Sequence, residues 1–163
     1  MSVTAADLAV LEQQLGRVPR GVVDIAARCV CGRPLVVTTA PRLDDGTPFP
    51  TTFYLTSPAA VKAVSTLEAG GAMEEMNRRL AADPALRAAY ERAHRDYLAR
   101  RALLGDVPEI ADVSAGGMPA RVKCLHALVG HALAAGPGVN PFGDEVLALL
   151  EASGTWSPRA CSC

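Results

Sequence analysis

The residues best suited to chemistry gather between Gly116 and Ala134, in a segment that otherwise has the apolar composition of a buried helix. They are one thiol, two imidazoles and two cations: Arg121, Lys123, Cys124, His126 and His131. Reactive polar side chains are costly to bury, so their presence on a core helix indicates a function. A thiolate and a neutral imidazole are both ligands of transition metals, and a thiolate beside an imidazole is also a nucleophile.

An unbroken helix over residues 119–135 would limit how these side chains cooperate. Cys124 and His131 would lie two turns apart on one face, separated by about 10 Å. That distance exceeds the reach of one zinc ion, whose bonds to sulfur and nitrogen are about 2.0–2.3 Å. His126 would point almost opposite to Cys124. A shared site therefore requires a cluster of irons, a helix that begins later, or ligands from another part of the chain.

Four further cysteines form two C-x-C pairs, Cys29 with Cys31 and Cys161 with Cys163. The commoner zinc knuckle is C-x₂₋₄-C, so neither pair is a strong metal signature by itself. In a reducing compartment, an odd total of five cysteines indicates free thiols or ligands. Cys29 and Cys31 could complete a site with Cys124 if the turn that carries them and the helix are neighbours. A structural role for Cys124 stays open, because buried cysteine also behaves as a small hydrophobe.

Cations flank two of these thiols. Arg28 precedes Cys29, and Lys123 precedes Cys124. A neighbouring cation lowers the pKa of a thiol, and it can also hold a phosphate or carboxylate group. We therefore expect Arg28 and Lys123 to be ligand-binding residues.

The elements that must position these residues give an α+β fold. Residues 21–29, 34–39 and 51–56 are rich in β-branched and aromatic side chains and predict a small antiparallel sheet near the N-terminus. Capping residues and apolar spacing predict about five helices packed against the sheet, over residues 4–15, 58–69, 73–104 (divided near Asp83), 119–135 and 141–152. We expect a single domain over residues 1–163, with residues 154–163 as a loose C-terminal tail.

Composition excludes several classes of protein. The net charge is −1, so no global field attracts nucleic acid, and no apolar run is long enough to insert into a membrane. The N-terminus lacks the pattern of a secretory signal, which predicts a cytoplasmic protein. Charges on nearly every turn of residues 86–104 predict an exposed helix, with His94, Tyr97 and Arg101 on one stripe, that can dock a protein partner.

The order of several motifs resembles a known family. The motifs are Arg28-Cys29-x-x-Gly32-x-Pro34, Thr47-Pro48-Phe49-Pro50-Thr51, Tyr54-Leu55-Thr56-x-Pro58, Leu67-Glu68, His94-x-x-Tyr97, Gly116-Gly117-Met118-Pro119, Val122-Lys123-Cys124-Leu125-His126 and Gly138-Val139-Asn140-Pro141-x-Gly143-Asp144-Glu145. The chain resembles the bacterial domain of unknown function 501 family in its actinobacterial form. The resemblance implies no activity, but it favours Cys29, Cys124, His126 and His131 as the functional set. It also implies genes near those for enolase and a septum-formation protein, which hints at housekeeping or division-linked work.

Three functions fit these residues. The leading hypothesis is a Cys/His site of Cys29, Cys124, His126 and His131 that binds zinc, iron or an iron–sulfur cluster, or else a small anionic ligand held by Arg28 and Lys123. The second is an enzyme in which Cys124 is the nucleophile and a nearby histidine its base. The third is a non-catalytic interaction module, linked to cell division, that docks through residues 86–104.

Overall fold

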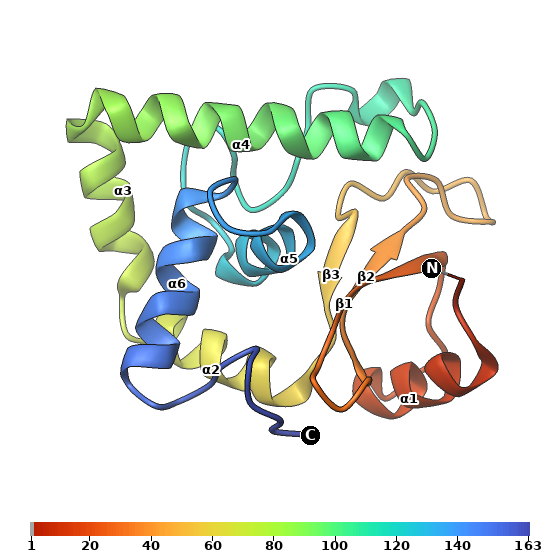
Figure 1. Cartoon of the computed structure of the whole chain (residues 1–163). Coiled ribbons are helices and arrows are strands. Elements are labelled where there is room, and N and C mark those ends of the chain that lie inside the picture. The colour runs from red at the N-terminus through yellow and green to blue at the C-terminus, as the bar shows by residue number, and fades with distance from the viewer. Residues whose placement is uncertain (1) are drawn as a thin grey trace.

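The structure is a computed structural model and describes residues 2–163. Within that range the chain forms a three-stranded sheet and six α-helices, so it is an α+β protein as the sequence predicts (Figure 1). The elements in chain order are α1 (Ala5–Leu15), β1 (Val22–Arg28), β2 (Pro34–Thr39), β3 (Phe53–Leu55), α2 (Pro58–Ala69), α3 (Ala72–Ala82), α4 (Pro84–Ala102), a 3-10 helix (Pro108–Ile110), α5 (Leu125–Ala135) and α6 (Pro141–Ala152).

The sheet is antiparallel in the order β1-β2-β3, and every residue of the central strand β2 is buried. The turn between β1 and β2 is closed by Gly32, whose φ of 92° lies in the left-handed region that glycine adopts without strain. The N–H of Gly32 donates to the Cys29 carbonyl at 2.8 Å, and the N–H of Cys29 donates to the Arg33 carbonyl at 2.8 Å. These two bonds fix the backbone that carries the first C-x-C pair.

Local sequence signals set most helix ends. Thr4 and Asp7 form a capping box at the start of α1, and Ser57 accepts a hydrogen bond from the backbone of α2. Asp83 caps α4, and Asn140 caps α6 by accepting from Gly143 N at 2.9 Å. Each cap satisfies backbone donors that the first helical turn leaves free, so these boundaries follow the sequence closely.

Helix α5 lies at the centre of the helical layer, between α2, α4, α6 and the sheet (Figure 1). Seven of its eleven residues are buried. Gly130 lets α5 approach β3, because a Cβ atom built on it would lie 2.7 Å from the carbonyl oxygen of Phe53. The contact places the second turn of α5 directly against β3.

The predicted start of this helix at residue 119 is wrong, because α5 begins at Leu125. The preceding segment forms a turn in which the Gly116 carbonyl accepts from Lys123 N at 2.7 Å and from Cys124 N at 3.3 Å. Gly117 has a φ of 91°, and a Cβ atom there would lie 2.5 Å from the Arg121 carbonyl oxygen. Only glycine permits the chain to come this close to itself. The turn therefore prevents a helix from forming before Leu125.

The charges of residues 86–104 predict an exposed helix, but one side of α4 is buried. Tyr90, Ala93, Tyr97 and Arg101 form a buried seam along it. Arg101 is only 4% exposed and donates to the backbone carbonyls of Pro50 and Ile110. The predicted stripe of His94, Tyr97 and Arg101 is therefore partly buried. Arg101 can be buried because two backbone carbonyls replace water as its hydrogen-bond acceptors.

The chain after α6 folds back over the body of the protein. Trp156 is 5% exposed and lies in the main hydrophobic core, and Thr155 N donates to the Leu150 carbonyl at 3.0 Å. Arg159 pairs with Glu151 of α6. The segment expected as a loose tail is therefore anchored at Trp156, and it runs toward the turn between β1 and β2 (Figure 1).

Among residues 2–163, no helix combines the length and the apolar composition that crossing a membrane requires.

Candidate metal centre and a second polar site

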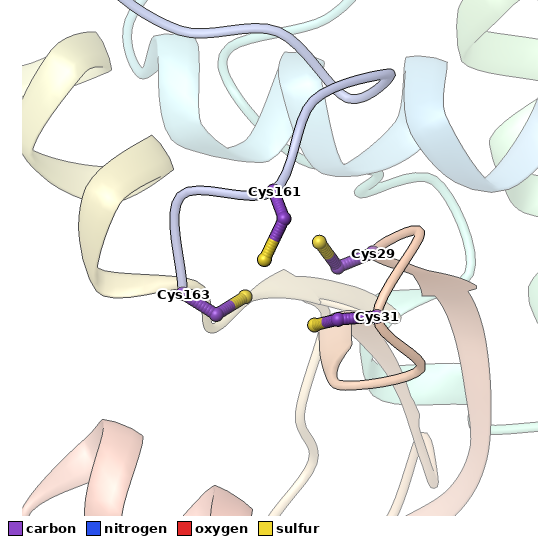
Figure 2. A group of neighbouring side chains, drawn as sticks. All are labelled: Cys29, Cys31, Cys161 and Cys163. Carbon is purple, nitrogen blue, oxygen red and sulfur yellow. The ribbon is translucent and has the colours of Figure 1, made fainter.

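Four cysteines from opposite ends of the chain meet at one place. The sulfur atoms of Cys29, Cys31, Cys161 and Cys163 all lie within 4.8 Å of one another. Figure 2 shows their side chains converging, two from the turn after β1 and two from the C-terminal segment. The described chain holds all five of its cysteines as free thiols, so no disulfide occupies this group.

The hairpin side of this group is held rigidly. Arg28 donates to both carboxylate oxygens of Asp7 on α1, at 2.7 and 3.0 Å, and to the Gly32 carbonyl at 2.9 Å. The guanidinium group holds the pKa of Asp7 well below its usual range. Because the same arginine ties the turn to α1, it fixes the direction of the C-x-C pair that the turn carries.

The C-terminal side is positioned by packing. Trp156, Pro158 and Cys163 line a small enclosed space together with Cys29 and Leu35, so the tail lies directly on the hairpin. Partial desolvation raises the pKa of Cys163 to about 12 although the residue is exposed, whereas the backbone N–H of Arg33 lowers the pKa of Cys31 to about 7. Cys31 therefore ionises more readily than Cys163.

The spacing of the sulfurs suits one tetrahedral ion. Four thiolates at the zinc–sulfur bond length of about 2.3 Å would lie about 3.8 Å apart, and the observed limit is 4.8 Å. A cluster of several irons holds the cysteines on different irons farther apart than a single ion does. Tetrahedral coordination by four sulfurs is characteristic of zinc or iron.

The later start of α5 brings Cys124 and His126 together in a different group, with Glu68 of α2. Donor atoms of the three lie within 4.8 Å of one another. Glu68 Oε1 lies 3.3 Å from His126 Nδ1, and Glu68 Oε2 accepts from Leu125 N at 2.8 Å. Cys124 is the N-cap residue of α5, but its side chain accepts no hydrogen bond from the helix. The Glu68 carboxylate accepts one of the free backbone N–H groups of the first turn instead.

The structure places His131 apart from both groups. Its ring is fully buried, stacks on Phe53 and lies edge-on to Tyr97. Its Nε2 lies 2.8 Å from Asp96 Oδ2 and its Nδ1 lies 3.1 Å from Asn140 Nδ2. The amide donates to Nδ1, so Nε2 carries the proton given to Asp96, and both nitrogens are satisfied within the core.

The remaining expected residues also separate. Arg28 is committed to Asp7 and Gly32, and Lys123 is exposed on the turn before α5. The structure therefore divides the expected set of Cys29, Cys124, His126 and His131 among three places instead of gathering it at one.

The expected ligand set omitted Cys31, Cys161, Cys163 and Glu68. The repeated C-x-C spacing was the signal for the three cysteines, but its meaning depends on the tail returning to the hairpin. For Glu68 the signal is its position on α2, because Val61, Ser65 and Glu68 recur at helical spacing and all three contact His126.

Comparisons with known proteins locate the chain in one family. A family model described as "Protein of unknown function (DUF501)" matches residues 25–148, which include Cys29, Cys31, Cys124 and His126 but neither C-terminal cysteine. No match was found among curated proteins or among solved structures. The matched residues make up most of the chain, and the protein therefore belongs to the DUF501 family.

Proposed function

We propose that this protein binds one zinc ion through Cys29, Cys31, Cys161 and Cys163. The observation that carries the proposal is the convergence of four sulfur atoms within 4.8 Å from two segments far apart in the sequence. Cys29 is buried and the other three thiols are exposed, and a bound cation would offset the mutual repulsion of the four groups in their ionised form.

Zinc accounts for the ligand set better than the alternatives. It is most often bound at structural sites by four protein ligands in tetrahedral geometry, and Cys₄ is one of its common sets. The four cysteines leave no coordination position open, so the site has the character of a structural one. Its effect is to join the C-terminal segment to the β1–β2 hairpin.

The proposal includes a reducing compartment, the cytoplasm. Thiols this close would be exposed to oxidation to disulfides outside it, and as disulfides they would no longer serve as ligands. All four are free in the structure, which supports the assignment.

Elemental analysis of protein purified under anaerobic conditions tests the proposal. We expect one zinc per chain in the unaltered protein and loss of zinc in Cys31→Ser and in Cys161→Ser. Cys124→Ser is the matched control, because Cys124 belongs to the other group, and it should retain zinc. Cobalt substitution should give the absorption bands of a tetrahedral tetrathiolate complex.

Two outcomes would overturn the assignment. Equal metal content in Cys161→Ser and in the unaltered chain would remove the C-terminal cysteines from the ligand set. Iron accompanied by acid-labile sulfide would replace the single ion by a cluster.

A further inference from the structure

A cavity of about 340 Å³ lies where β3 meets α2 and α5, away from the four clustered cysteines. Its walls are largely apolar and include Phe53, Leu55, Val61 and Ala127. Cys124 and His126 also line it, so one thiol and one imidazole enter an otherwise mainly apolar space. A concave apolar pocket with a few convergent polar groups is the usual form of a small-molecule site.

The contacts of His126 define its protonation. Nδ1 lies 3.3 Å from Glu68 Oε1, and Nε2 lies 3.2 Å from the Val61 carbonyl oxygen and 3.0 Å from Ser65 Oγ. A carboxylate and a carbonyl only accept hydrogen bonds, so both ring nitrogens have an acceptor for a proton. Acceptors at both nitrogens favour the protonated ring, the imidazolium, beside the thiol.

The thiol responds to that charge. Burial is the largest single influence and would raise the pKa of Cys124, but the His126 ring, whose donor atom lies within 4.8 Å of the sulfur, and the backbone N–H of Ala127 together leave the pKa below its ordinary value. The same contact with Cys124 raises the pKa of His126 despite partial burial of the ring. A thiolate paired with an imidazolium is the reactive form of a cysteine nucleophile.

Glu68 positions this pair. One carboxylate oxygen faces His126, and the other accepts the N–H of Leu125 at 2.8 Å, so the carboxylate is fixed to the first turn of α5. Nucleophile, imidazole and orienting carboxylate are the three parts of a cysteine-dependent catalytic group. Both His126 nitrogens already have protein partners, so we do not count this ring among the metal ligands.

We propose that Cys124 is the nucleophile of an acyl-transfer site that accepts a short aliphatic acyl group from an activated ester or thioester. The sulfur forms a bond to the carbonyl carbon while the bond from that carbon to the leaving oxygen or sulfur breaks. The leaving group takes a proton from His126, which then becomes neutral. Water or another acceptor can next attack the thioester, with His126 taking the proton of that nucleophile, which restores the starting state without any change of oxidation level.

The lining of the cavity selects the acyl class. An aliphatic chain matches walls made by Phe53, Leu55 and Val61, and the cavity volume is at the small end for ligand sites. A phosphate ester would need uncompensated positive charge, whereas the imidazolium here is already paired with Glu68. The site shares no residue with the proposed zinc ligands, so the two proposals stand or fall separately.

The experiment uses the full, zinc-loaded chain with p-nitrophenyl butyrate as the probe. We expect a burst of one nitrophenolate per chain and a butyryl adduct on the peptide that contains Cys124, formed at least tenfold faster than on free cysteine at pH 7. Cys124→Ser should abolish both the burst and the adduct while retaining zinc. The dodecanoyl ester should react much more slowly, because its chain exceeds the cavity.

His126→Gln tests the role of the imidazole, and His94→Gln is its matched control. We expect His126→Gln to slow acylation at least tenfold at pH 7 and to recover much of the rate at pH 9, where the thiol ionises without help. His94 is hydrogen-bonded to Ser114 and does not line the cavity, so its variant should acylate at the normal rate. A thiol no more reactive than free cysteine, or an adduct spread over the other cysteines, would overturn the proposal.

Discussion

Removal of the proposed zinc ion should lower the thermal stability of the protein by a limited amount. An ion that binds only the folded state stabilises it by about 2.7 kcal/mol when its free concentration is 100 times its Kd. For a domain of this size, 163 residues, each kcal/mol shifts Tm by about 2–4 °C, so chelation should lower Tm by about 5–11 °C. The chain should still unfold cooperatively without the ion, because the core that contains Trp156 includes one of the four ligands, Cys29, and otherwise consists of apolar side chains that pack without it.

Differential scanning calorimetry of the zinc-loaded and chelated chains measures this shift. Cys161→Ser should unfold near the temperature of the chelated chain, and its Tm should not respond to added zinc. Cys124→Ser serves as the control and should keep the full response to zinc. The reasoning would be refuted by a chain that holds one zinc yet has the same Tm after the ion is removed, since the ion would then do nothing to join the two ends of the chain.

Two further results are expected. Burial lowers the pKa of His131. Below the ordinary histidine pKa of about 6.5, the unfolded chain therefore binds a proton at this imidazole that the folded chain does not bind. The free energy of unfolding should fall as the pH drops from 6.5 to 5.5, by up to about 1.4 kcal/mol per pH unit for this imidazole. The raised pKa of His126 contributes a slope of opposite sign, so urea unfolding of His126→Gln across that range measures the effect of His131, and a flat profile in that variant would contradict the buried neutral ring. Gly130→Ala would place a Cβ atom 2.7 Å from the Phe53 carbonyl oxygen, so we expect it to destabilise the protein by about 1–3 kcal/mol, the usual range for overpacking. Gly46→Ala is the control, because no atom lies within 4 Å of its Cβ, and it should show only the smaller cost of its positive φ. Equal unfolding midpoints for these two glycine variants would show that α5 can move away from β3 freely.

The helices and strands were largely predictable because their signals are local. Ser57 before Pro58, Asp83 before Pro84 and Asn140 before Pro141 each give a capping side chain and a first-turn proline. The one large error was the start of α5, where apolar periodicity extended into a segment that Gly116 and Gly117 fold into a turn. The backbone hydrogen bonds of that turn join Gly116 to Lys123 and Cys124, and the spacing of apolar residues gives no sign of them.

The sequence by itself determined the fold class, most helix boundaries and the inventory of reactive groups: five thiols, three histidines and the charges around them. Only the tertiary structure decided which of these groups meet. Cys161 and Cys163 reach the hairpin because Trp156 packs into the core and turns the tail back, and Glu68 of α2 joins Cys124 and His126 because its carboxylate accepts the N–H of Leu125. Both events join segments that are distant in the chain, and their energy comes from burial and from one hydrogen bond to another helix. No spacing within a single stretch of sequence encodes either of them.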